Sequence, residues 1–337
     1  MKAYKGFNRD MTCRGLTYEE GKSYEEEQAE VCESGFHACE NPLDCFSFYA
    51  PATSEYHEVE LDGNIKKSVS GDTKVAATQI KIGAKLSIAG LVKAAIDFVF
   101  KKAKPTSGKH AHAATSGYEA HAATSGDRAH AATSGNRAHA ATSGCWANAA
   151  TSGDYAHAAT SGCHAHAATS GYEAHAATSG YEAHAATSGD CAHAATSGCH
   201  AHAATSGDRA HAATSGNWAN AATSGNWANA ATSGKHAHAA TSGNRAHAAT
   251  SGKYAHAATL GDGANAEVKG KDSVAAVLGR GCRARGGMGC WLVLTERDDN
   301  WHVLGVKAVK VDGKKVKADT WYELSGGNVV KAKGGAK

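Results

Sequence analysis

The sequence predicts a mainly β protein: a central β-solenoid with two nine-residue repeats per coil, between an α+β N-terminal cap and a small β-meander C-terminal cap. The first observation is a unit, Ala-His-Ala-Ala-Thr-Ser-Gly-x-x, that recurs without insertion or deletion from about Thr106 to Gly261. A short fixed period indicates one backbone geometry stacked on itself. The second is that the flanking segments, 1–104 and 271–337, have mixed composition, so we divide the chain at 104 and 270.

The N-terminal segment is expected to combine strands with two helices. Strand candidates are Met1–Phe7, Tyr56–Leu61 and Val75–Ile82. Asn41 and Pro42 precede a short helix over Leu43–Tyr49. Apolar residues at helical spacing after Ser87 predict an amphipathic helix that ends before Pro105. We expect that helix to cover the open end of the solenoid, where backbone groups would otherwise be unpaired.

Alternation within one repeat predicts which side chains face inward. Ala129, Ala131 and Thr133 share one parity and are small, so they should face the interior, where the Thr hydroxyl needs a hydrogen-bond partner. Arg128 and His130 share the other parity and should face outward on the strand.

The variable pair of each repeat indicates how many repeats close one coil. Lys or Cys fills the first variable slot six times, always in odd-numbered repeats counted from Lys109, namely at Lys109, Cys145, Cys163, Cys199, Lys235 and Lys253. This alternation predicts an 18-residue coil with two strands, two corners and two chemically different edges. Whenever the second slot is Trp, the His slot two residues later is Asn, as at Trp146 and Asn148. The sequence leaves the handedness of the coil open.

The C-terminal segment is expected to begin with modified repeats and to end in a meander. Gly261, Gly270 and Gly279 keep the nine-residue step while the side chains become larger and more apolar. Predicted strands, with a hairpin turn over Val311–Lys314, are Cys290–Thr295, Trp301–Val311, Lys315–Lys317 and Thr320–Leu324.

The His column and the Cys residues are the possible sites for metal or redox chemistry. We interpret the His column as a structural ladder, with metal binding as the alternative, and expect it to loosen as pH falls through about 6. His37 with Cys32, Cys39 and Cys45 is a weak candidate for zinc because the spacing is loose. Cys145 and Cys163 become neighbours in an 18-residue coil, where we expect reduced thiols and a disulfide is the alternative.

Bulk composition excludes several classes of function. The net charge of +3 over 337 residues gives no reason to expect nucleic-acid binding, and no apolar run suggests a membrane span. The first ten residues lack the apolar segment of a signal peptide, so we expect cytoplasmic synthesis, with virion association or release on lysis both open. No nucleophile elbow, phosphate loop or zinc-protease motif is present, so we expect no enzyme and no cofactor.

Two stretches resemble known proteins. The N-terminal MKAYKGFNRDMTCRG and CESGFHACENPLDC resemble a domain of unknown function common in bacteriophage and prophage proteins, and the closing GCWLVLTERDDNWHVLGV and DTWYEL resemble its accompanying cap. The repeats are similar to the head repeats of trimeric autotransporter adhesins, although the period is nine here and longer there. The resemblance implies no catalytic residue.

We therefore expect a non-enzymatic, phage-type structural or binding rod that presents its variable edge residues to a protein partner. A self-assembling filament subunit is the alternative, which would make the chain a homo-oligomer, and an inhibitor of a host defence system is a second. Large aromatic residues and Arg are favoured at interfaces. The predicted binding residues are Arg128, Arg137, Trp146, Tyr155, Arg209, Trp218, Trp227, Arg245 and Tyr254.

Overall fold

The computed structural model describes residues 1–51, 53–68, 73–103 and 105–332. The chain is mainly β, with a β-solenoid of about ten turns and a small N-terminal α+β region. It divides into two compact units, Met1–Thr187 and Ser188–Lys337, and each is described by itself.

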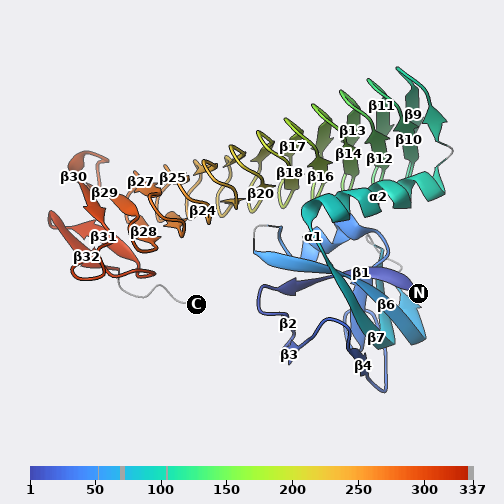
Figure 1. The fold of residues 1–337 in the computed structure, drawn as a ribbon, viewed down its shortest axis with the longest axis horizontal. Coiled ribbons are helices and arrows are strands. Elements are labelled where there is room, and N and C mark those ends of the chain that lie inside the picture. Colours follow the sequence, from blue (N-terminus) through green and yellow to red (C-terminus); the bar gives the residue numbers. More distant parts are fainter. Residues whose placement is uncertain (52, 69–72, 104, 333–337) are drawn as a thin grey trace. The chain divides into compact units, whose positions relative to one another are not determined.

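The first unit begins with a small antiparallel β-barrel. Strands β1, β5, β6 and β7 close on themselves because β7 pairs with both β5 and β6 while β1 pairs with the same two strands, and β4 extends the sheet (Figure 1). The strands of this region are β1 (Lys2–Asn8), β2 (Thr12–Cys13), β3 (Leu16–Thr17), β4 (Ser23–Glu25), β5 (Phe36–Cys39), β6 (Ser54–Lys67) and β7 (Lys74–Leu86). The three predicted strands are confirmed, and β6 and β7 run beyond their predicted limits.

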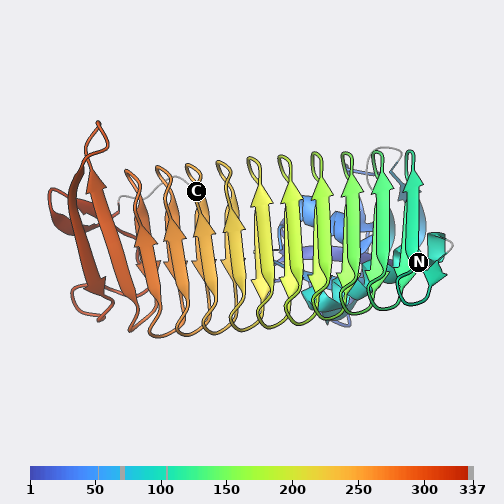
Figure 2. The ribbon, with the colours of Figure 1, turned by 90° about the horizontal axis from the view of Figure 1, so that it is seen from above.

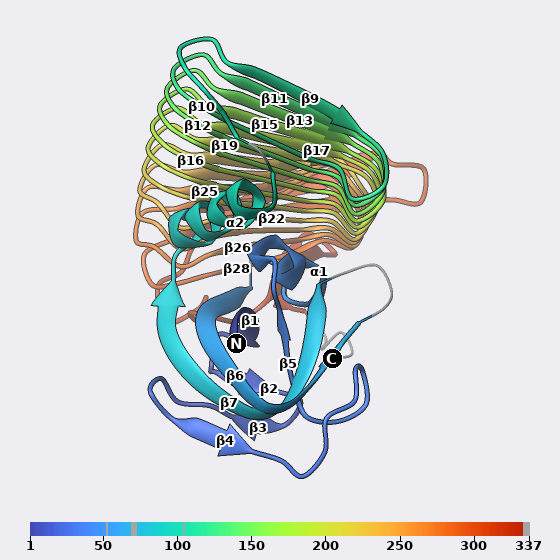
Figure 3. The same cartoon turned by 90° about the vertical axis from the view of Figure 1, so that its right-hand side faces the viewer.

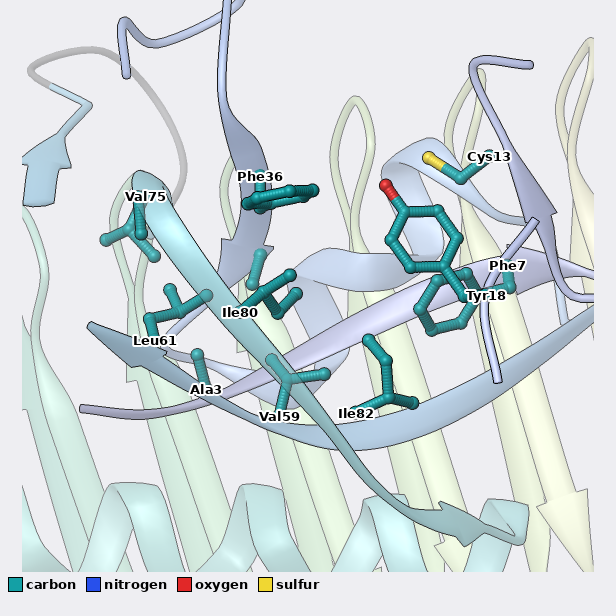
Figure 4. Packing of buried hydrophobic residues seen from close by; sticks show 12 residues of the cluster. Ala3, Phe7, Cys13, Tyr18, Phe36, Val59, Leu61, Val75, Ile80 and Ile82 are labelled. Atoms are coloured by element: carbon teal, nitrogen blue, oxygen red, sulfur yellow. The ribbon is translucent and has the colours of Figure 1, made fainter. Parts of the chain in front are cut away.

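The barrel interior holds the largest apolar side chains of this region. Phe7, Val59 and Ile82 are wholly buried and lie in one cluster with Tyr18 and Phe36 (Figure 4). Alternate residues of each strand supply these side chains, as expected for strands with one face toward a core. This cluster forms the core of the barrel.

Two helical segments leave the barrel. The 3-10 helix η1 (Pro42–Asp44) and α1 (Cys45–Phe48) form the predicted short helix, and the Asn41 side chain accepts a hydrogen bond from the backbone N–H of Leu43 at 3.2 Å. Helix α2 (Ile88–Lys102) begins at Ser87, whose hydroxyl accepts from the N–H of Gly90. No helix in the described ranges has the length and apolar character needed to cross a membrane.

Helix α2 covers a face of the solenoid and not its open end, so that part of the prediction is wrong. The helix contacts β10, β12, β14 and β16, and its buried apolar residues are Leu91, Val92, Ala95, Ile96 and Val99. Figure 3 shows α2 lying along the side of the coils. The outward Ala side chains of these strands, such as Ala141 and Ala159, are buried beneath it. A row of small side chains gives a helix a broad apolar surface to bury, whereas a coil end offers only backbone edges.

The solenoid strands of the first unit form two parallel sheets. We call the sheet of odd-numbered strands the odd sheet and the other the even sheet. The even strands are β8 (Thr106–Ser107), β10 (His121–Ser125), β12 (His139–Ser143), β14 (His157–Ser161) and β16 (His175–Ser179). The odd strands are β9 (His112–Ser116), β11 (His130–Ser134), β13 (Asn148–Ser152), β15 (His166–Ser170) and β17 (His184–Ser188).

Strand pairing confirms the coil of two repeats. His121 pairs with His139 and His112 pairs with His130, so each residue lies beside the residue 18 positions later. Inward Ala129, Ala131 and Thr133 are buried, as the alternation predicts. The Thr hydroxyls differ from expectation, because the Oγ1 atoms of Thr133, Thr160 and the other buried Thr in this slot have no hydrogen-bond partner among the described residues.

The corners require glycine because successive coils approach closely. Gly126 has φ +123°, and a Cβ atom there would lie 2.4 Å from the carbonyl oxygen of Gly108 in the preceding coil. Only glycine tolerates both the positive φ and the close approach of the neighbouring carbonyl oxygen. The repeated Ser-Gly is therefore part of the coil architecture.

The second unit contains further coils and a C-terminal β region. Its even strands are β18 (His193–Ser197), β20 (His211–Ser215), β22 (Asn229–Thr232), β24 (His247–Thr250), β26 (Asn265–Val268) and β28 (Arg283–Gly286). Its odd strands are β19 (His202–Ser206), β21 (Asn220–Thr223), β23 (His238–Thr241), β25 (His256–Thr259) and β27 (Val274–Val277). Within each of the two sheets, neighbouring strands among these are parallel. Figure 2 shows this for the sheet that faces the viewer.

The C-terminal meander is confirmed in part. Strands β29 (Trp291–Arg297) and β30 (Val303–Lys310) form an antiparallel pair, and β31 (Tyr322–Ser325) pairs with β32 (Asn328–Lys331), which was not predicted. The predicted strand Lys315–Lys317 and its hairpin are wrong. The Asp312 carboxylate accepts hydrogen bonds from the backbone N–H groups of Lys314 and Val316, which folds this segment into a compact loop.

Candidate functional site

The nine predicted binding residues all lie in the corners of the coil. Each occupies the second variable slot, and its φ lies between 55° and 61°, the left-handed region. The predicted outward strand position of Arg128 is therefore wrong, because the strand begins only at His130. The backbone N–H of Arg128 donates to the carbonyl of Cys145 in the next coil at 2.8 Å, which fixes this geometry. The side chains consequently project from the edges.

Within each unit, the coil brings these residues into ladders along two edges. We call the corners that precede odd strands the odd edge and the others the even edge. In the first unit the odd edge carries Arg128 and Trp146, and the even edge carries Arg137 and Tyr155. In the second unit the odd edge carries Trp218 and Tyr254, and the even edge carries Arg209, Trp227 and Arg245.

The odd edge of the second unit holds a continuous stack of rings. The centroid of His200 lies 6.2 Å from that of Trp218, Trp218 lies 4.2 Å from His236, and His236 lies 5.1 Å from Tyr254. The ring planes differ by 15° or less. In the first unit, Trp146 stacks on His164 at 4.2 Å. The His members were missed by the sequence analysis, although each lies in the same slot as the predicted Trp and Tyr.

The even edge pairs cations with rings. The guanidinium of Arg245 lies 4.7 Å from the Trp227 ring centroid. In the first unit, that of Arg137 lies 4.9 Å from Tyr118 and 3.6 Å from a carboxylate oxygen of Glu119. Such contacts hold Arg in one orientation before any partner binds.

The ladder side chains remain open to solvent. Trp146, Trp218 and Trp227 are 53%, 50% and 52% exposed, and Tyr254 is 48% exposed. Because neighbouring rings cover each other's faces, the exposed part of a stacked ring is its edge. The arrangement offers a preordered surface of ring edges and cations.

The coupling of Trp with Asn has a direct contact as its cause. The side-chain amide of Asn148 donates to the backbone carbonyl of Trp146 at 3.1 Å, and Asn229 does the same to Trp227 at 3.4 Å. The Asn therefore braces the corner from which the indole projects.

The first variable slot has a structural role that the sequence analysis missed. An Asn or Asp there accepts a hydrogen bond from the backbone N–H of the residue 18 positions later. The Oδ1 of Asn226 accepts from Asn244 at 3.0 Å, and that of Asn244 accepts from Asp262 at 2.8 Å. The enrichment of Asn and Asp in even repeats could have indicated this ladder, which we call the Asx ladder.

The His rings stack on both sheets of the first unit, and on the even sheet three of them, His139, His157 and His175, are also buried. His112 and His130 stack at 5.0 Å with planes 4° apart. His139 and His175 lie beneath α2 and η1, and burial lowers the pKa of His139 well below its ordinary value and that of His175 to about 3. The buried rings therefore favour their neutral form.

Hydrogen bonds from the N-terminal region hold the buried His. The Asp44 Oδ1 lies 3.1 Å from Nε2 of His157, and Nδ1 of His175 donates to the carbonyl of Leu43 at 2.7 Å. Burial alone would raise the pKa of Asp44, but hydrogen bonds from His157 and Thr73 outweigh it and lower that pKa. This part of the column anchors the barrel region to the first coils.

The weak metal candidates lie around one cavity without converging. The Nε2 of His37 is 2.9 Å from the backbone N of Cys32, and Cys45 donates its thiol to the carbonyl of Tyr4. Cys39 is buried and forms no disulfide, and the same cavity is lined by all four residues. Among the described residues, no group of three or more His, Cys, Asp or Glu is arranged to hold a metal ion.

The Cys pair of the odd edge is present as free thiols. Cys145 and Cys163 are both unbridged. The neighbouring thiol of Cys145 raises the pKa of Cys163. The 18-residue coil thus places them together, as predicted.

Comparison with known proteins gives one match. Residues 1–94 match the family described as Domain of unknown function (DUF7666). No curated protein and no solved structure matches the chain.

Proposed function

We propose that the chain is a non-enzymatic binding protein whose solenoid presents the corner ladders to a protein partner. The observation that carries this proposal is the stack of His200, Trp218, His236 and Tyr254, with its rings half exposed at Trp218 and Tyr254. Exposed aromatic residues in one array are characteristic of interaction surfaces.

Preordering supports a role in binding. An exposed Trp or Arg normally loses rotamer freedom when it enters an interface, which costs about 0.5–1.5 kcal/mol per side chain. Here the stacking of Trp218 on His236, and of Arg245 on Trp227, restricts these side chains before binding. These side chains would therefore lose less conformational entropy when a partner binds.

The charges beside the stack indicate the chemistry of the partner. Lys235 and Lys253 occupy the first slots of the same odd edge, each directly before a stacked ring. A surface of Lys, His and aromatic edges is complementary to an acidic protein surface. Single-stranded nucleic acid fits this edge less well, because base stacking needs free ring faces and the faces here are occupied by neighbouring rings.

A capture experiment tests the proposal. The wild-type chain is compared with Trp218→Ser combined with Tyr254→Ser in capture from the producing cell, followed by affinity measurement with each purified protein captured. We expect the double variant to bind at least about tenfold more weakly, as for loss of two interface aromatics. Trp301→Ser, which removes an equally exposed Trp outside the ladders, is the matched control. Equal affinity of wild type and double variant would contradict the proposal.

The resemblance to phage and prophage proteins supports placing this partner in a phage-encoded assembly. That part of the proposal is tested by asking whether the captured partner is encoded next to the chain.

A second candidate, self-assembly, is favoured by the edge strand β30. It pairs with β29 on one side and is the last strand of its sheet. Val303, Leu304 and Val306 are 51%, 63% and 56% exposed. Exposed apolar edge strands pair readily with other chains. Light scattering of wild type and Leu304→Lys tests this candidate: a wild-type monomer at high concentration would rule it out.

A further inference from the structure

The N-terminal barrel region contains a cavity that the proposed function does not use. It has a volume of about 560 Å³ and is lined by residues of β1, β2, β5 and α1. This volume lies within the usual range of small-ligand sites. Its aromatic lining residues are Tyr4, Tyr18, Phe36, Phe48 and Tyr49.

A buried cation lies against this cavity. Lys5 is only 5% exposed, and its Nζ donates to the carbonyl oxygen of His37 at 2.8 Å. The same Nζ lies 3.5 Å from Sγ of Cys13 and faces the rings of Phe7 and Tyr18 at 5.3 and 5.9 Å. Within the described residues, no carboxylate lies within ion-pair distance of Lys5. A buried ammonium without a counter-charge is unfavourable, so an anion in the cavity would be stabilised there.

Other charges of the cavity wall add to this preference. Arg14 and Lys74 also line the cavity, and the ammonium of Lys74 lies 4.0 Å from the Phe48 ring centroid. Two carboxylates, Glu26 and Glu33, line it as well. Glu26 accepts a hydrogen bond from the backbone N–H of Gly35 at 3.0 Å. Three cations against two carboxylates leave the wall cationic.

A thiol beside Lys5 provides a reporter for occupancy. The phenol of Tyr49 donates to Sγ of Cys13 at 2.8 Å, so Cys13 lies between Tyr49 and Lys5. A molecule paired with Lys5 would therefore hinder attack of Cys13 on an alkylating reagent.

We propose that this cavity binds a small organic anion that carries an aromatic ring. Its anionic group, a carboxylate or a phosphate, pairs with Lys5, and its ring lies among the aromatic lining residues. The mouth of the site is formed in part by Arg14, whose guanidinium donates to the carbonyl of Cys32 at 3.4 Å.

Binding of four probes to the full chain tests the proposal by calorimetry: benzoate, phenyl phosphate, inorganic phosphate and benzyl alcohol. We expect benzoate or phenyl phosphate to bind, and the stronger of the two identifies the anionic group. Inorganic phosphate, which lacks the ring, and benzyl alcohol, which lacks the charge, should bind at least about tenfold more weakly.

Three variants locate the site. Lys5→Gln should weaken the better probe at least about tenfold and Arg14→Gln about threefold. Lys66→Gln, an exposed Lys of β6 outside the cavity, should leave affinity unchanged. If Lys5→Gln does not fold by circular dichroism, Arg14→Gln and protection of Cys13 decide the matter.

Protection of Cys13 is the independent measurement. With iodoacetamide, the thiol sulfur forms a bond to the acetamide carbon while iodide leaves and the thiol proton passes to solvent. A saturating probe should slow alkylation of Cys13 several-fold and leave Cys163, an exposed thiol of the odd edge, unaffected. Absence of binding by both aromatic anions up to about 10 mM, or affinity that Lys5→Gln and Arg14→Gln leave unchanged, would overturn the proposal.

Discussion

The carboxylate of Asp44 lies 3.1 Å from Nε2 of His157, and both side chains are more than nine-tenths buried. The other carboxylate oxygen of Asp44 accepts from the backbone N–H of Thr73 at 2.7 Å and from its hydroxyl at 2.6 Å. One acidic residue of the N-terminal region thus joins Thr73, the residue before β7, to a His of the repeat. The repeats of the solenoid are nearly identical in sequence, and this contact distinguishes His157 from the other His residues of the column.

Replacing Asp44 should loosen the first unit. Asp44→Asn leaves a buried His157 without its carboxylate, and breaking such a buried pair costs about 3 kcal/mol. Hydrogen exchange of β12, β14 and β16 measures the effect, with Asp97→Asn on the exposed side of α2 as control. Unchanged protection of β14 would show that the contact contributes little.

Acidification should destabilise the protein through the buried His. Burial lowers the pKa of His175 to about 3 and that of His211 to about 4. The pKa of each His is lower in the folded state than in the unfolded state, where it is near 6.5. The stability that these neutral His contribute is therefore complete above about pH 6.5 and is lost as pH falls toward 3–4, because the unfolded state takes up the protons first. At pH 5 the loss is about 2 kcal/mol for each group.

Thermal unfolding at about pH 7.5 and pH 5 measures this dependence. The shift in melting temperature should shrink in His175→Gln, which removes a buried ring, and persist in His130→Gln, which removes an exposed one. Equal melting temperatures of the wild type at the two pH values would contradict the expectation.

Removing a buried hydroxyl should stabilise the coil. The Oγ1 of Thr160 is buried without a hydrogen-bond partner, and Val already occupies the corresponding slot at Val268 and Val277. Thr160→Val keeps the shape and should raise the free energy of unfolding by about 1 kcal/mol. Thr115→Val, at an exposed Thr of β9, is the matched control and should have little effect. A destabilised Thr160→Val would indicate that the hydroxyl has a partner in solution.

The Asx ladder should contribute to the stability of the second unit. Asn226→Ala removes the acceptor for the N–H of Asn244 and should cost about 1 kcal/mol, detected as faster hydrogen exchange of that N–H. Asn226→Asp keeps an acceptor and should be tolerated. Lys235→Ala, on the odd edge, tests whether truncation alone has the same effect.

The coil itself could be predicted from the sequence, whereas the burial of one His column could not. The nine-residue period and the alternation of small residues follow from the strand and corner within each repeat. The sorting of Cys and Lys into alternate repeats follows from the two repeats in each coil. His130 and His139 lie in identical five-residue strands, yet His130 is exposed and His139 is buried. The difference arises from α2 and η1, which pack on only one sheet, and no local pattern within the repeat reports such a contact.

For the corner ladders, the sequence predicted which residues are exposed but not the conformation of their backbone. The exposed Trp, Tyr and Arg of the second slot were identified by composition, but their left-handed backbone was not, because strand alternation was extended two residues beyond the start of the strand. The cavity beside Lys5 was missed altogether. Its walls come from segments spread over β1 to β7, and only the closed barrel brings them together.

The pairing of each residue with the residue 18 positions later restricts how the length of such a chain can change. Loss or gain of two repeats preserves the order of Asx acceptors, cations and rings along each edge. Loss of a single repeat moves every later repeat to the opposite sheet, so Lys and Cys corners of the odd edge would continue onto Asn and Asp corners of the even edge. Recombination between identical repeats would therefore yield functional lengths in steps of 18 residues, and natural variants should differ by even numbers of repeats.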